Sequence, residues 1–358
     1  MAPLYIISSS CISPQQSFTC EGLDMDIQVS ENNMLPCIEP DFKAYINPVQ
    51  IRRMSRALKI GFATAVECLN KSEDIIPEAI MIGTGKGCLT DTEQFLHSIR
   101  EYNETALNAT HFIHSTYNQL NGMIALNRKI SSYNMTYVHR GFSFEHALLD
   151  AFLLFDEGDT ATALVGSFDE MTAEHFTVKK HWGYWKRELI NSLDLIESKT
   201  PGTISGEGSA FYLLNKEKPL TEAISITHVS TLFRPTSSDI EEATDKLLAD
   251  HSLQRKNIDI ILSGNNGDRN LSESYLFFEQ LFPASQVLFF KHLCGEYDTA
   301  TSFACWLSHR LLQTQQVPPY LFHPEAETKI YNKGFKYVLI YNNYTDLNQS
   351  LILLSRDN

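Results

Sequence analysis

The order of hydrophobic and polar residues between Asn134 and Glu170 predicts a strand, a tight turn, a helix and a second strand. Residues Met135 to Val138 alternate among β-forming side chains, and the run ends at Arg140-Gly141. From Phe144 to Phe155 the apolar residues recur at helical spacing. Thr160 to Val165 is an apolar run as short as a buried strand. This order is typical of a βαβ unit, and a turn that leads into a helix can present backbone N–H groups to an oxyanion.

The same alternation of strand and helix patterns recurs on both sides of the charged, proline-containing segment 215–219. Before this segment, Leu4–Ser9 is predicted to be a strand, and a long helix is predicted to begin at Pro48, with the proline in its first turn. Beyond it the patterns predict, in turn, elements at 223–232, 239–250, 258–262, 273–281, 287–290 and 298–313, and a final hairpin of 336–342 with 350–354. We therefore expect an α/β protein with two similar halves, residues 1–216 and 217–358.

Composition narrows the classes of function. The chain has 358 residues, 43% of them hydrophobic, and a formal net charge of −14, so binding of nucleic acid through a broadly basic surface is not expected. No uninterrupted apolar run approaches the about 18 residues that a membrane span needs. The first residues read as a strand rather than a signal peptide. The seven cysteines are odd in number and lack CxxC spacing, which favours reduced thiols and a cytoplasmic protein.

Two polar stretches are candidate binding sites. His111 and His114 are three residues apart, but no carboxylate or cysteine stands at ligand spacing, so we expect no metal site there. Residues 179–189 combine basic and aromatic side chains. Stacking of nucleic-acid bases on these aromatic side chains is one interpretation. Because the chain is acidic overall, we prefer to interpret the stretch as a protein-contact surface or a solvated helix face.

Several motifs, in the right order, resemble the β-ketoacyl-[acyl carrier protein] synthases. The frame of their nucleophile elbow is present at Ala147, Ala151, Gly158-Asp159 and Gly166. Further matches are the Gly-Thr-Gly-Lys-Gly turn at 83–87, the polar segment with Phe112 at 109–127, and the Gly-Glu-Gly turn at 206–208. The resemblance implies the thiolase-like fold, five layers αβαβα built from two pseudo-duplicated halves. It also implies that the basic cluster at 52–56 lies near where a carrier protein docks.

The residues that the resemblance assigns to catalysis are replaced. Gly141 stands where the family has its cysteine nucleophile, and Ser143 is the nearest hydroxyl. Gly264 or Asn265 stands at the first catalytic histidine. Lys291 is kept, but Glu296 stands at the second histidine. In the glycine-rich oxyanion loop all three glycines are absent and Tyr344 occupies the phenylalanine position, so we expect that loop to follow another path.

These replacements predict an inactive β-ketoacyl synthase homologue that acts like a chain-length factor. Such proteins pair with an active ketosynthase and shape the tunnel that holds the growing fatty acid, polyketide or polyene chain. The expected partners are therefore a ketosynthase, or a second copy of this chain, and an acyl carrier protein, with no cofactor. One alternative is an acyltransferase or hydrolase with a site rebuilt from Ser143, His146, Lys291 or Glu296, although no third orienting group is evident. Another is a homodimer that binds an acyl group.

Aromatic residues are expected to line or fill the vacated acyl site. The resemblance assigns Phe112, with the rest of 109–127, to the dimer interface and the acyl tunnel. Phe142 and Phe144 flank the turn at Gly141, and we expect one of their rings to point into the site. Tyr344 is expected to approach from the opposite side. The segment 109–127 and the strand before Gly141 should together form a large apolar interface.

Overall fold

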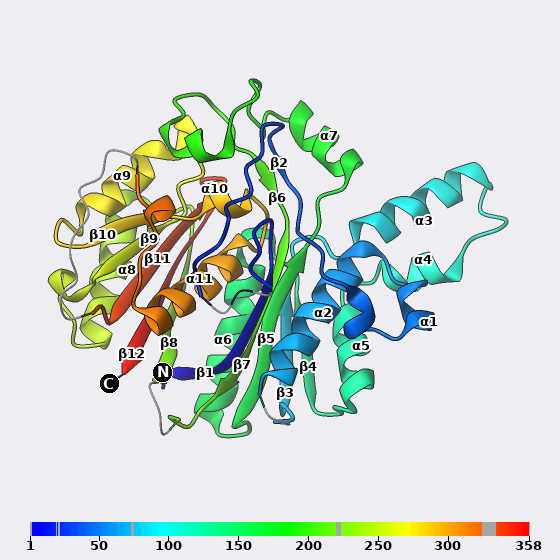
Figure 1. Ribbon diagram of the computed structural model, residues 1–358, viewed down its shortest axis with the longest axis horizontal. Helices are drawn as coiled ribbons and strands as arrows, with labels where there is room; N and C mark the ends of the chain where they lie inside the picture. Colours follow the sequence, from blue (N-terminus) through cyan, green and yellow to red (C-terminus); the bar gives the residue numbers. More distant parts are fainter. Residues whose placement is uncertain are drawn as a thin grey trace.

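The computed structural model describes residues 2–18, 20, 22–72, 75–219, 223–323 and 334–357. Ten strands form one mixed sheet in the order β10-β9-β11-β12-β8-β1-β7-β5-β3-β4 (Figure 1). The strands of one end are β1 (Leu4–Ile12), β7 (Gly208–Asn215), β5 (Thr162–Asp169), β3 (Ala79–Gly83) and β4 (Tyr133–Tyr137). Those of the other end are β8 (Ala223–Phe233), β12 (Asn348–Asp357), β11 (Tyr337–Tyr344), β9 (Ile260–Ser263) and β10 (Gln286–Phe289).

The two ends of the sheet repeat one topology. At one end β3 pairs in parallel with β4 and β5, while β5–β7 and β7–β1 are antiparallel. At the other end β9 pairs in parallel with β10 and β11, while β11–β12 and β12–β8 are antiparallel. Taken in chain order, both sets of strands therefore have the same spatial arrangement. The predicted thiolase-like duplication and the C-terminal hairpin are confirmed, whereas the division of the chain at residue 216 stays a prediction.

Helices make up the remaining layers. Between the two ends of the sheet lie α6 (Ser143–Glu157) and α11 (Ala300–Thr314); all residues of α11 from Ala300 to Leu312 are buried, as expected of a central helix (Figure 1). One outer face carries α2 (Arg56–Asn70) and α5 (Gln119–Arg128). The other carries α8 (Ser237–Asp250) and α9 (Ser272–Gln280). No helix among the described residues is long and apolar enough to cross a membrane.

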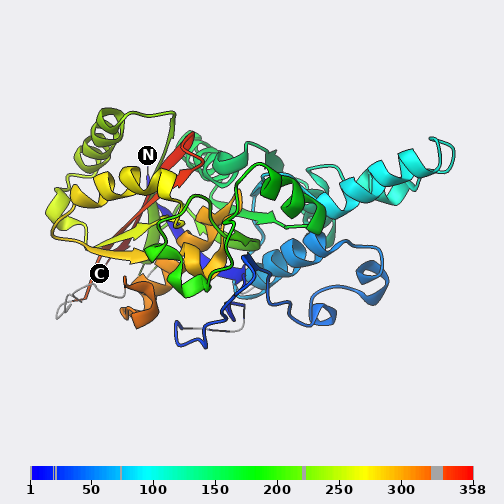
Figure 2. The same ribbon diagram turned by 90° about the horizontal axis from the view of Figure 1, so that it is seen from above.

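The remaining helices, strands and turns are mostly short and are added to these layers. Figure 2 shows α3 (Leu89–Glu101) and α4 (Ala109–His114) projecting from these layers as an arm. The others are α1 (Pro48–Ile51), α7 (Ala173–His181), α10 (Lys291–Cys294), the two-stranded sheet of β2 (Met34–Leu35) and β6 (Ser205–Gly206), and 3₁₀ turns at Phe42–Ala44, Arg140–Phe142, Ser192–Glu197, Arg255–Asn257, Arg269–Leu271 and Pro319–Leu321.

The prediction of one long helix from Pro48 is wrong in one respect, because the structure has two helices separated by a break. Helix α1 ends at Ile51, and Ser55, with an extended backbone (φ −67°, ψ 169°), is the N-cap of α2. The Ser55 side chain makes no capping hydrogen bond, so the extended backbone at this residue is what separates the two helices. The basic cluster at 52–56 therefore lies at the break between two helices rather than along one helix face.

Candidate functional site

The turn at Gly141 connects β4 to α6, as the sequence predicted. Arg140 has a left-handed backbone (φ 48°), and residues 140–142 form a 3₁₀ turn. The buried Ser143 hydroxyl accepts a hydrogen bond from the His139 N–H (2.8 Å) and donates one to the Arg140 carbonyl (2.8 Å). Both bonds hold the turn itself, so this hydroxyl serves as a local cap.

Tyr344 fills the space beside Gly141. A Cβ atom built on Gly141 would lie 2.7 Å from the Cβ, Cγ and Cδ1 atoms of Tyr344, closer than real Cβ contacts come. The Tyr344 side chain is buried, and its hydroxyl donates a hydrogen bond to Asp298. The tyrosine approaches this position from the end of β11, across from the turn. The Tyr344 ring thus occupies the space that a side chain at position 141 would need.

The three phenylalanines proposed to bind substrate lie in three different surroundings. Phe142 is buried at the turn, with its ring stacked on His139 (centroids 5.6 Å apart). Phe144 is fully buried in the core near Tyr212 (5.9 Å). Phe112 is 56% exposed on the arm. Their proposed role in substrate binding stays a prediction, and of the three only Phe142 and Phe144 are near the turn.

A buried charge cluster surrounds the Tyr344 hydroxyl. Asp298 forms an ion pair with Lys86, and Lys179 Nζ lies 3.5 Å from the Tyr344 hydroxyl oxygen. Burial alone would raise the pKa of Asp298, but the Lys179 and Lys86 ammonium groups outweigh it and hold that pKa below its ordinary value. Burial lowers the pKa of Lys179. The cluster therefore fixes Tyr344 by both hydrogen bonding and charge.

Lys179 was not expected at the site. The stretch 179–189 was interpreted as a contact surface or a solvated helix face, but Lys179 and Lys186 are only 3% and 2% exposed. The Lys179 ammonium lies 5.0 Å from the centroid of the Tyr184 ring and 5.2 Å from that of Trp185. Aromatic rings stabilise a desolvated ammonium. The interleaving of lysines with Tyr184 and Trp185 was the signal in the sequence for this arrangement.

Lys291 and Glu296 form a buried ion pair. The Lys291 Nζ atom lies 2.6 Å from Glu296 Oε1, and the two side chains are 0% and 4% exposed. The Asn266 amide donates to Glu296 Oε2 (2.8 Å). Asn265, proposed to stand at the first histidine, instead accepts from the Gly267 N–H (3.0 Å) in its own turn, and Gly264 packs against Asn342 and the backbone of Tyr341. Asn266, one residue further on, is the side chain that reaches the site.

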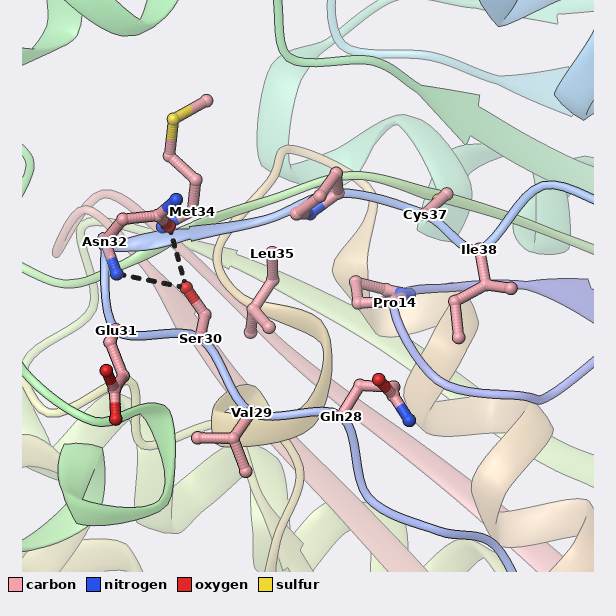
Figure 3. A pocket seen from close by; sticks show the side chains of 11 residues that line it. Pro14, Gln28, Val29, Ser30, Glu31, Asn32, Met34, Leu35, Cys37 and Ile38 are labelled. Atoms are coloured by element: carbon pink, nitrogen blue, oxygen red, sulfur yellow. Dashed lines mark hydrogen bonds between the residues drawn. The ribbon is translucent and has the colours of Figure 1, made fainter.

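A cavity of about 280 Å³ opens beside this ion pair. Glu296, Asn266 and Tyr184 are among its lining residues, and we call it the Glu296 cavity. A separate hollow of about 470 Å³ is lined by Pro14 and side chains of the segment 28–38, including Val29, Leu35 and Ile38 (Figure 3). None of the proposed site residues lines that second hollow. Of these two hollows, the Glu296 cavity is therefore the one that adjoins the candidate site.

The described residues around the vacated site offer no activated nucleophile. Cys294 is fully buried, and burial raises the pKa of its thiol well above the ordinary value, so the thiolate is disfavoured. The Ser143 hydroxyl is engaged at the turn, and no hydrogen bond joins it to His146 among the interactions of the described residues. Burial lowers the pKa of His146. These side chains are therefore not arranged as a nucleophile with its base.

Glu145 is a buried carboxyl group on α6, behind the turn. Its Oε1 atom accepts a hydrogen bond from the Ser350 hydroxyl (2.9 Å), while Oε2 has no hydrogen-bond partner among the described residues. Burial raises the pKa of Glu145 from 4.5 to about 7. The folded protein therefore favours the protonated form of this side chain.

Glu145→Gln should make the protein more stable at neutral and higher pH. Because the pKa in the folded state is raised, the stability tied to Glu145 is fully present below pH 4.5 and is lost as pH rises to about 7. The loss amounts to about 3 kcal/mol. Urea unfolding at several pH values should show the variant and the wild type alike near pH 4.5 and diverging above it. A difference that does not depend on pH would contradict this assignment.

Comparison with known proteins shows which proteins share this fold. Residues 28–190 match the family described as the N-terminal domain of β-ketoacyl synthases, and no curated protein sequence matches the chain. The ishigamide ketosynthase/chain length factor superposes with a TM-score of 0.80 at 13% identity, over 100% of both chains.

Two further solved structures also superpose on the chain. One is a type II acyl carrier protein in complex with its ketosynthase bound to the hexaketide (TM-score 0.73, 13% identity, 99% of both chains). The other is a ketosynthase in complex with its chain length factor from Xenorhabdus doucetiae (0.73, 15%, 99% of this chain and 98% of that one). At such identities the structures show a shared fold.

Proposed function

We propose that the chain is a catalytically silent member of the β-ketoacyl synthases, because residues 28–190 match the N-terminal domain of that family and the whole chain shares the fold of ketosynthase structures. It acts like a chain-length factor, pairing with an active ketosynthase in fatty acid, polyketide or polyene synthesis. The observation that carries this proposal is the contact of Tyr344 with Gly141, the residue that the resemblance places at the nucleophile position. The ion pair of Glu296 with Lys291 adds support, since a carboxylate stands where the family has a histidine.

An exposed apolar face supports the pairing. Strand β4 is the last strand of the sheet and pairs with β3 alone (Figure 1). Three apolar side chains in or next to β4 are 37–41% exposed, namely Tyr133, Met135 and Val138. Phe112 of α4 and Leu126 of α5 are exposed by 56% and 83%. We call Tyr133, Met135 and Val138 the β4 face, and the exposed Phe112 and Leu126 are further apolar side chains of the segment 109–127. An unpaired edge strand with apolar side chains is a template for another chain.

The choice of partners follows from the complexes to which the chain is similar. Similar structures include a ketosynthase with its chain length factor and a ketosynthase with its acyl carrier protein. We therefore propose a ketosynthase subunit on the β4 face and a carrier protein as a further partner, with the complex in the cytoplasm. A homodimer through the same face is the alternative, because self-pairing of β4 about Met135 would bring no like charges together.

Met135→Lys tests this proposal. The substitution places a charge at the centre of β4, and burying an unpaired ammonium should weaken the complex by at least about 100-fold. Size-exclusion chromatography with light scattering would compare the chain alone and co-expressed with a cysteine-containing ketosynthase from the same genome. Leu276→Lys on α9, 56% exposed and away from the β4 face, is the matched control and should leave assembly unchanged. A wild-type chain that stays monomeric at micromolar concentration, with or without the ketosynthase, would overturn the proposal.

A further inference from the structure

The Glu296 cavity has an acidic lining. Three carboxylate side chains, Asp268, Glu296 and Asp346, are among its lining residues, which include no lysine, arginine or histidine. Lys291 neutralises Glu296, but neither Asp268 nor Asp346 forms an ion pair within the described part of the chain. The buried Lys186 ammonium faces both Glu188 and Asp268, so it offsets only part of this negative charge, and Asp346 adds to it. The resulting negative potential attracts a cation.

The lysines behind the cavity do not reverse this potential. Lys86 and Lys179 face the carboxylates of Asp298 and Asp169, so two cations are opposed by two anions. Asp169 accepts hydrogen bonds from the Thr299 hydroxyl (2.7 Å) and the Gly85 N–H (2.8 Å), which hold it in place. A ligand that enters the cavity therefore meets mainly the negative charge of the residues that line it.

Aromatic side chains complete the lining. Trp182 is 71% exposed and Tyr184 is half-buried, and both line the cavity. A large indole that faces solvent at the edge of a hollow offers a surface for stacking and for cation–π contact. The adjoining rings of Tyr184 and Trp185 already hold the Lys179 ammonium, so this loop is suited to cations.

We infer that the Glu296 cavity binds a small organic cation, a primary amine or guanidinium carried on a body the size of a single ring. The size follows from the volume of about 280 Å³, which suits a fragment rather than a long chain. The amide of Asn270 and the hydroxyl of Thr203 add hydrogen-bonding groups to the lining. An anionic ligand such as a malonyl carboxylate is disfavoured by the carboxylates of Asp268 and Asp346. This inference does not depend on the proposed partner role.

Matched probes test the charge preference. Isothermal titration calorimetry would compare benzylamine, benzyl alcohol, benzoate and pantetheine with the whole chain. We expect benzylamine to bind at least about tenfold more tightly than benzyl alcohol, a difference of about 1.4 kcal/mol, and benzoate not to bind. Equal binding of the amine and the alcohol, or no benzylamine binding up to about 10 mM, would overturn the inference.

Variants locate the site. Trp182→Ala and Asp346→Asn change exposed side chains and should each weaken benzylamine binding at least about fivefold. Glu242→Gln, an exposed carboxylate on α8 away from the cavity, should have no effect. If pantetheine binds in preference to benzylamine and the same two variants abolish it, the cavity serves the arm of a carrier protein. That result would overturn the cation site and leave the proposed function standing.

Discussion

Glu296→Ala should lower the free energy of unfolding by about 3–5 kcal/mol. The substitution leaves the Lys291 ammonium, which is 0% exposed, without its 2.6 Å partner, and a buried unpaired charge is strongly destabilising. It also leaves the amide of Asn266 without its 2.8 Å acceptor. Urea denaturation at pH 7 would measure the change.

Two matched variants separate this effect from a general loss of contacts. Glu241→Ala removes one partner of an exposed ion pair with Arg255 and should cost at most about 1 kcal/mol. The double variant Lys291→Met with Glu296→Leu replaces both charges by apolar groups and should recover most of the stability lost in Glu296→Ala. If Glu296→Ala were no worse than Glu241→Ala, Lys291 and Glu296 would not form the buried pair described above.

Gly141→Cys should destabilise the protein by about 1–3 kcal/mol and yield no condensing activity. The new Cβ would lie 2.7 Å from three atoms of Tyr344, so the ring must shift, together with its hydrogen bond to Asp298. A thiol alone should restore no condensation, because the resemblance places Glu296 and either Gly264 or Asn265, rather than two histidines, at the other catalytic positions. Denaturant unfolding and mass spectrometry of products from acyl- and malonyl-pantetheine would measure both outcomes.

Tyr344→Gly is the matched second change, because it removes all three atoms that Gly141→Cys would meet. A double-mutant cycle should show the two changes to be less harmful together than their sum by about 0.5–3 kcal/mol. Additive effects would show that the ring does not fill the position of the nucleophile. Condensation product from Gly141→Cys alone would show that the remaining machinery is intact.

Much of the fold followed from the sequence because both ends of the sheet repeat clear period-2 and period-3.6 patterns. The helix after Gly141 ends at Gly158, which is left-handed (φ 84°), as its sequence indicated. The break between α1 and α2 was missed, because arginine and methionine both favour helix and only the cap geometry of Ser55 reveals it.

The features of the candidate site that depend on position within a sequence motif were predictable. The features that depend on contacts between distant segments of the chain were not. The approach of Tyr344 to Gly141 followed from the register of the family motifs. The burial of Lys179 depends on Asp298 and Tyr344, more than 100 residues away, and nothing local in the sequence places them together. The same holds for Asn266, whose bond to Glu296 spans two strand–helix connections, whereas its neighbour Asn265 is used locally.

The central claim, that the vacated site is silent, is tested most directly by the intact mass of the purified chain after incubation with an acyl-pantetheine thioester. With Gly141 in place of the nucleophile, Ser143 held by two backbone bonds and Cys294 fully buried, the mass should remain that of the unmodified chain. A cysteine-containing ketosynthase under the same conditions should gain one acyl group. A stable acyl adduct on this chain, mapped to Ser143 or Cys294, would contradict the account.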